Sequence, residues 1–114
     1  MGKYAVEVRR LALQLTDAIL ESLGLGQAYM RDKLDEGMQV MTVNKYEKRP
    51  EMAGSVLGLA AHSDYGCITI LLQSCEGLQI ADRNTNTWKT VPLECPDPLP
   101  VQIGDYLELS SNGL

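Results

Sequence analysis

The sequence has little of several residue types that mark particular protein classes. Histidine occurs once among 114 residues, and phenylalanine is absent. The three cysteines (Cys67, Cys75 and Cys95) form no C-x-x-C pair, which argues for reduced thiols rather than a disulfide framework. No apolar run reaches the roughly 18 residues that span a bilayer, and no signal-peptide core follows Met1. We therefore expect a cytoplasmic protein without a membrane span.

The charge balance lacks a basic excess. Ten Lys and Arg residues stand against fifteen Asp and Glu residues, and the formal net charge is −5. Nucleic-acid-binding domains carry a basic stripe, which this sequence does not show, so we expect no nucleic-acid partner. Hydrophobic residues make up 45% of the chain, an ordinary share for one globular domain.

The N-terminal part of the chain has the periodicity of helices. Between residues 4 and 23, apolar residues recur at steps of three and four, which predicts an amphipathic helix. Gly24 is placed to end this helix as a left-handed cap. A shorter second helix is predicted over about residues 27–35, so we expect residues 1–36 to form a helical segment.

From Gly37 onward the pattern changes to short, alternating runs that are rich in β-branched residues. The predicted strands cover residues 38–46, 56–62, 67–72, 77–81, 87–91, 101–103 and 106–109. The polar residues 82–86 predict a hairpin turn between the fourth and fifth of these strands. We expect Trp88 to anchor the core and Gly104-Asp105 to form a hairpin corner. Helices followed by many short strands favour a mainly β fold, as a double-sheet jelly roll or a related barrel.

The strongest chemical signal lies in residues 57–66. In an extended strand successive side chains alternate between faces, so His62 and Asp64 project together while Ser63 turns away. An imidazole nitrogen and a carboxylate oxygen that converge in this way can bind a divalent metal, and such mixed ligands suit iron among other first-row metals. A His-x-Asp tripeptide is a weak motif, however. A structural histidine beside a turn-forming aspartate is the alternative interpretation.

Further motifs occur in order along the same part of the chain. They are Asn44-Lys45-Tyr46, the run Leu57 to Gly66, Ile70-Leu71-Leu72-Gln73, Gly77-Leu78-Gln79, Trp88 to Pro92, Ile103-Gly104-Asp105 and Ser111-Asn112-Gly113. Together they resemble the plant-type 2-oxoglutarate- and Fe(II)-dependent dioxygenases, the family of flavonoid, gibberellin and other specialised-metabolite oxygenases. The resemblance implies an incomplete double-stranded β-helix (a cupin-like jelly roll) over residues 37–114, with residues 1–36 packed on it.

The resemblance also implies roles for four residues. His62 and Asp64 match the family's first two iron ligands, and Asn44 and Tyr46 match the Asn-x-Tyr pair that hydrogen-bonds 2-oxoglutarate. Without the resemblance, Asn44 would be interpreted as a strand-end cap and Tyr46 as a half-buried aromatic residue. The expected metal is Fe(II) and the expected cosubstrate is 2-oxoglutarate. Dioxygen and a small organic substrate complete the expected partners.

The match to the family is incomplete at its far end. The family's second histidine ligand follows shortly after the Ser-Asn-Gly motif, and the arginine of a later Arg-x-Ser pairs with 2-oxoglutarate; neither lies within these 114 residues. We therefore expect a fragment of a dioxygenase that is inactive alone. One alternative is a catalytically inactive oxygenase-like module that binds a metabolite or a protein. Another is a dimer that builds its metal site from two copies of His62 and Asp64.

Overall fold

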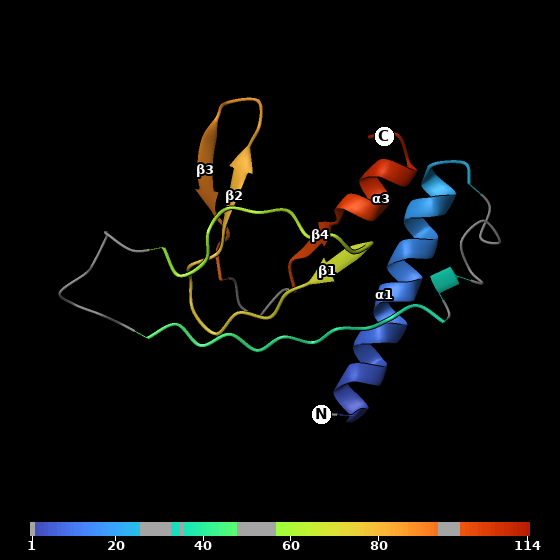
Figure 1. Cartoon of the computed structure of the whole chain (residues 1–114), viewed down its shortest axis with the longest axis horizontal. Helices are drawn as coiled ribbons and strands as arrows, with labels where there is room; N and C mark the ends of the chain where they lie inside the picture. The colour runs from blue at the N-terminus through green and yellow to red at the C-terminus, as the bar shows by residue number, and fades with distance from the viewer. Residues whose placement is uncertain (1, 26–32, 35, 48–56, 94–98) are drawn as a thin grey trace.

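The described part of the chain combines one long helix with short strands and a final short helix. The computed structural model describes residues 2–25, 33–34, 36–47, 57–93 and 99–114. Its helices and strands are α1 (Gly2–Ser22), β1 (Ile68–Ile70), β2 (Gln79–Asp82), β3 (Thr87–Thr90), β4 (Val101–Ile103) and α3 (Asp105–Ser110). In Figure 1, α1, β1, β4 and α3 lie together at one end, while the β2–β3 hairpin stands apart from α1.

Helix α1 confirms the amphipathic helix predicted between residues 4 and 23. Its buried residues, Thr16 and Leu20, are one turn apart and therefore lie on one face. The Thr16 hydroxyl donates a hydrogen bond to the carbonyl of Ala12 at 2.9 Å, so this polar group is satisfied within the helix. Gly24 has a φ of 70°, which confirms the predicted left-handed end.

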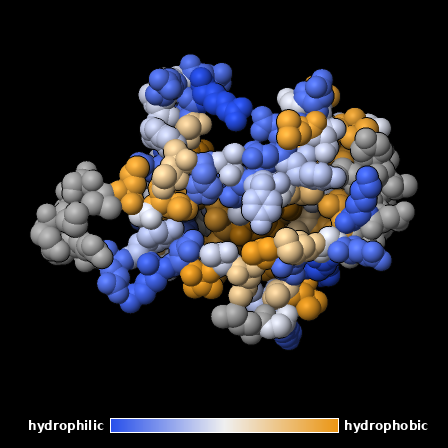
Figure 2. All heavy atoms as spheres, viewed as in Figure 1, coloured by the Kyte–Doolittle hydropathy of each residue, from blue (hydrophilic) through white to orange (hydrophobic). Residues whose placement is uncertain are grey.

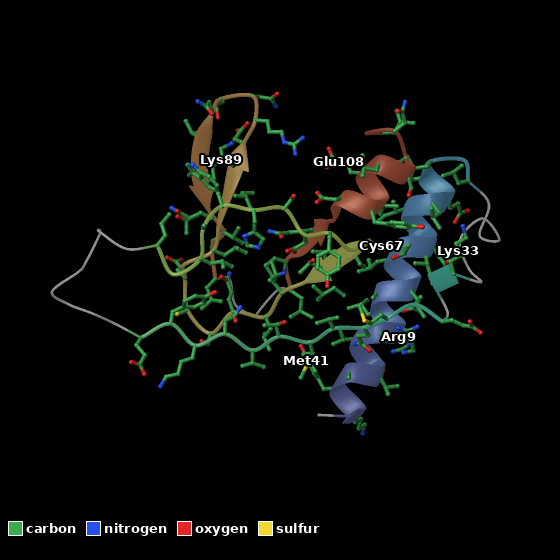
Figure 3. All side chains as sticks on the ribbon, in the orientation of Figure 1. Arg9, Lys33, Met41, Cys67, Lys89 and Glu108 are labelled. Atoms are coloured by element: carbon green, nitrogen blue, oxygen red, sulfur yellow. The ribbon has the colours of Figure 1, made fainter. Side chains whose placement is uncertain are left out.

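The extended segment 36–47 begins on the side of α1. The Arg9 guanidinium donates hydrogen bonds to the carbonyls of Leu34 and Gly37, at 3.0 Å each. The Gln39 amide donates to the carbonyl of Ala5, also at 3.0 Å. These bonds tie the start of the segment to α1, and Figure 3 shows Arg9 and Met41 where the segment passes the helix.

The strands form two separate antiparallel sheets of two strands each. β1 pairs with β4, and β2 pairs with β3. The second pair confirms the predicted hairpin. Its turn is closed by the Asp82 carboxylate, which accepts hydrogen bonds from the backbone N–H groups of Asn84 and Thr85 at 2.9 and 3.3 Å.

Two of the predicted strands are wrong in the described residues. Residues 38–46 are extended without strand pairing, and residues 57–62, the described part of the run 56–62, form a bend and irregular chain. Alternation reports which faces of a segment are apolar, but a strand also needs a neighbour to bond with. Most of the predicted helix over residues 27–35 lies outside the described residues.

The predicted last strand over residues 106–109 is also wrong, because this segment belongs to helix α3. Asp105 and Glu108 give the helix an acidic first turn, which favours a helix start, and Leu107 is buried. A short apolar run does not by itself distinguish a strand from a buried helix. Gly104 is accordingly the N-cap of α3 and not a hairpin corner.

The described chain buries a small core. Leu20 and Leu107 are 1% and 2% exposed, and the partly buried residues packed against them are Ile19, Leu25, Leu34, Cys67 and Ile68. The accessible surface is 9380 Å², against roughly 6,200 Å² for a folded monomer of this mass. Trp88 is 55% exposed, so the expectation that it anchors the core is wrong. Figure 2 correspondingly shows apolar side chains at the surface in several places.

The predicted order of elements, a helix first and antiparallel strands after it, is confirmed. The described residues form two small sheets and do not form a complete jelly roll. Among the helices that the structure describes, none combines the length and apolarity needed to cross a membrane.

Candidate metal site and its supporting loop

The side chains of His62 and Asp64 lie beside one another on the loop that leads into β1. The Nε2 atom of His62 is 3.5 Å from Oδ1 of Asp64. The Nδ1 atom of His62 is 2.8 Å from the carbonyl oxygen of Ala60. Because a carbonyl only accepts hydrogen bonds, this contact assigns the imidazole proton to Nδ1. The lone pair of a neutral ring is then on Nε2, the atom nearest to the carboxylate.

This pair of donors fits a divalent metal ion. A histidine ligand usually donates its other ring N–H to a carbonyl or a carboxylate, as His62 does to Ala60. Two donors that each lie about 2.1 Å from one ion are about 3.0 Å apart at an angle of 90° and about 3.4 Å apart at the tetrahedral angle. The separation of 3.5 Å is close to the tetrahedral value, and the two side chains are 51% and 31% exposed, so an ion can reach them.

The pair supplies two protein ligands. Among the described residues, no group of three or more His, Cys, Asp and Glu side chains is arranged to hold a metal ion. The neighbouring Cys67 packs against the core, and burial raises the pKa of its thiol. Because the thiolate is the form that binds metals, this protonated thiol is a poor ligand.

The loop that carries the pair is bonded to the start of α3. Three backbone N–H groups donate to loop carbonyls: Asp105 to Asp64 at 2.7 Å, Gly104 to Cys67 at 2.8 Å and Tyr106 to Gly66 at 3.2 Å. The Ser63 hydroxyl also donates to Oδ2 of Asp105 at 3.0 Å. The side chain of the residue between His62 and Asp64 is therefore bonded to the start of α3.

Gly104 allows the loop and α3 to approach this closely. A Cβ atom on Gly104 would lie 2.1 Å from the carbonyl oxygen of Gly66 and 2.9 Å from that of Asp64. The φ of Gly104 is −95°, which any residue adopts, so glycine is required here for space and not for backbone conformation.

The residues predicted to bind 2-oxoglutarate, Asn44 and Tyr46, lie on the exposed extended segment 36–47. The ring of Tyr46 covers the backbone of Gly58, where an added Cβ would be 2.6 Å from Cδ1 of the ring. This contact brings the segment to the start of the loop that leads to His62.

Sequence reasoning did not identify the bond between Ser63 and Asp105. The two residues are 42 positions apart, and no local pattern joins them. No signal in the sequence could have found it, because Ser63 is exposed and water could satisfy its hydroxyl.

The comparison with protein families decides which family the chain represents. A model described as the 2OG-Fe(II) oxygenase superfamily matches residues 37–114, which is more than half of the chain. The chain belongs to this superfamily. The resemblance that the sequence motifs indicated is thereby confirmed.

Three curated relatives of this 2OG-Fe(II) oxygenase chain are plant proteins. Flavanone 3-dioxygenase 3 from Oryza sativa subsp. japonica is 54% identical over 113 residues, which are 99% of this chain and 34% of the relative. The rice 2-oxoglutarate-dependent dioxygenase 21, chloroplastic, is 46% identical with the same coverage. Jasmonate-induced oxygenase 4 from Arabidopsis thaliana is 41% identical over 98% of this chain and 32% of the relative. The chain spans about a third of the length of these relatives. No solved structure matches it.

Proposed function

We propose that this chain is part of an Fe(II)- and 2-oxoglutarate-dependent dioxygenase that oxidises a small organic substrate. The observation that carries the proposal is the 3.5 Å approach of His62 Nε2 to Asp64 Oδ1 in a chain of this superfamily. These two atoms would hold Fe(II), which supplies the activation of dioxygen when it is bound.

The other proposed site residues act on the cosubstrate. Asn44 and Tyr46 would donate hydrogen bonds from an amide and a phenol to a carboxylate of 2-oxoglutarate. Such donors bind the carboxylate without adding a formal charge beside the metal. Since the described residues offer two ligands and no group of three, we propose that the 114-residue chain holds iron weakly and is inactive alone.

For the whole protein we propose a specialised-metabolite or hormone substrate together with dioxygen. The names of two relatives, a flavanone 3-dioxygenase and a jasmonate-induced oxygenase, support this substrate class. The division into a helical segment 1–36 and an oxygenase region 37–114 belongs to the same proposal, and the family match that begins at residue 37 supports it. The cytoplasmic location stays a prediction, and the chloroplastic relative gives the alternative that a fluorescent fusion would detect.

A segment exchange tests this function. The 113 matching residues of this chain replace their counterparts in rice flavanone 3-dioxygenase 3, so the host supplies the rest of the enzyme. We expect the exchanged enzyme to convert 2-oxoglutarate to succinate. His62→Ala and Asp64→Ala should each lower turnover by more than the roughly 100-fold that loss of an outer partner of a metal ligand can cost.

The control is Glu21→Ala on the exposed surface of α1, which should leave turnover unchanged. Turnover that survives His62→Ala would overturn the proposed role of His62 as a ligand. Succinate production by the isolated 114-residue chain would overturn the proposal that this chain is inactive alone.

The second candidate is a catalytically inactive oxygenase-like module that binds a small metabolite or a protein partner. The observation that favours it is the absence of a third ligand among the described residues. This candidate predicts that the isolated 114-residue chain is monodisperse in size-exclusion chromatography and melts in one cooperative transition, as an independent binding module must and an inactive fragment need not.

A further inference from the structure

We propose that Asp105 is a positioning residue for the metal pair and that it acts through Ser63. This inference rests on the proposed function of His62 and Asp64 as ligands. Asp105 makes two contacts with the loop: its N–H donates to the carbonyl of Asp64 at 2.7 Å, and its carboxylate accepts from the Ser63 hydroxyl at 3.0 Å. Asp105 therefore holds both the main chain of Asp64 and the side chain of Ser63, the residue between the two ligands.

These two bonds fix the direction in which the ligands point. The two ligand side chains lie together, with His62 Nε2 3.5 Å from Asp64 Oδ1, while the Ser63 hydroxyl between them in the sequence is held against α3. The bond to the Asp64 carbonyl fixes the rotation of the following peptide unit as well. A ligand pair that is oriented before the metal arrives loses less conformational entropy on binding.

Helix α3 is a suitable anchor because it contains half of the described core. Leu107 of α3 packs in the same cluster as Leu20 of α1, whereas Ser63 and His62 are exposed. Figure 1 shows α3 beside α1 at the end of the molecule where β1 and β4 pair. Through Asp105, the exposed loop is bonded to the most buried part of the described structure.

Asp105 does not act as a third ligand. Its Oδ2 atom faces the Ser63 hydroxyl, and the described residues contain no metal-holding group of three or more such side chains. Its effect on the metal is therefore transmitted through the loop, and a substitution that keeps an oxygen acceptor at this place should preserve it.

The test measures Co(II) affinity by titration of the exchanged enzyme, without 2-oxoglutarate or substrate. Asp105→Ala and Ser63→Ala should each raise the Kd for Co(II) about 10-fold, the lower end of the effect of outer partners on metal sites. Asp105→Asn keeps an acceptor oxygen for the Ser63 hydroxyl and should restore the affinity to within about 2-fold of the unsubstituted enzyme.

The matched control is Glu108→Ala. This substitution removes another carboxylate from α3, one that pairs with Arg83 at 3.4 Å. Its Kd for Co(II) should not change. If Asp105→Ala fails to fold, Ser63→Ala removes the same hydrogen bond from the exposed side and gives the answer.

A metal-free measurement separates this inference from the proposed function. Amide hydrogen exchange at residues 104–106 should be slow in the unsubstituted enzyme and about 10-fold faster in Asp105→Ala, as expected for the loss of one hydrogen bond. Fast exchange without any substitution, no Co(II) binding, or equal Co(II) affinity in Asp105→Ala would each overturn the inference. If the variants rank in Co(II) affinity as expected but the exchanged enzyme forms no succinate, the proposed function is overturned and this inference is not.

Discussion

Leu20 of α1 and Leu107 of α3, 87 positions apart in the sequence, are the two buried hydrophobic side chains of one core cluster. Their contact joins the N-terminal helix to the helix that supports the metal loop. We expect Leu107→Ala to lower the free energy of unfolding by about 2 kcal/mol or more, because it removes buried apolar surface and leaves a cavity. Urea unfolding of the 114-residue chain measures this, with the exposed Leu109→Ala as control. Equal midpoints for the two variants would contradict it.

Gly104→Ala should separate the loop from α3. The added Cβ would stand 2.1 Å from the carbonyl oxygen of Gly66, so one of the two backbones must move. We expect a loss of stability of about 1–3 kcal/mol, as for other overpacked sites. A weaker Kd for Co(II) should accompany it.

Gly77→Ala is the matched control for this substitution, because a Cβ there meets no atom within 4 Å. Thermal melting and the Co(II) titration are run on both variants in the exchanged enzyme. If Gly104→Ala behaves like Gly77→Ala in both measurements, the close approach has no consequence for the loop.

Tyr46→Phe tests the proposed contact with 2-oxoglutarate. Loss of a hydrogen bond to a charged carboxylate should raise the KM for 2-oxoglutarate about 10-fold, while the ring keeps its packing on Gly58. Succinate formation by the exchanged enzyme gives the KM. Tyr65→Phe, on another exposed tyrosine, is the control, and an identical KM in the two variants would remove Tyr46 from the site.

The β2–β3 hairpin should lose stability in acid through Asp82. The hydrogen bond from the Lys89 ammonium, followed by those from the backbone of Asn84 and Thr85, lowers the pKa of Asp82 below its usual 3.8. A carboxyl group whose pKa is lower in the folded state stabilises that state above pH 3.8, and this contribution is lost as the pH falls through the lower value.

The fluorescence of Trp88, the single tryptophan, reports the hairpin in the 114-residue chain. We expect a transition below pH 4 that is absent in Asp82→Asn. Glu76→Gln, a substitution before the hairpin, should leave the transition in place. An identical acid profile in Asp82→Asn would show that this carboxylate does not stabilise the hairpin.

Local patterns in the sequence predicted the local elements. Helix α1, the left-handed Gly24 and the turn closed by Asp82 depend on neighbours within a few residues, and periodicity and turn chemistry report such neighbours. The run 38–46 was predicted wrongly because strand formation depends on a partner that the segment itself does not specify. Residues 106–109 were predicted wrongly because a short apolar run does not distinguish a strand from a buried helix.

For the site, too, the sequence predicted the local arrangement and not the long-range support. The spacing of His62 and Asp64 was enough to place the two side chains together, and the structure has them 3.5 Å apart. Their role as ligands stays a prediction. The support from Asp105 comes from 42 residues away and depends on how α3 packs, which no motif within the loop encodes.

The hydrogen bonds from Arg9 to the carbonyls of Leu34 and Gly37 fix the start of the extended stretch 37–46 on α1. At the other end of this stretch, the ring of Tyr46 packs on Gly58, so both ends are attached. An insertion or deletion of a single residue between these attachments would shift the phenol by about 3.3 Å, more than a hydrogen bond tolerates. This exposed stretch should therefore keep a constant length among functional relatives, although surface segments ordinarily accept such changes.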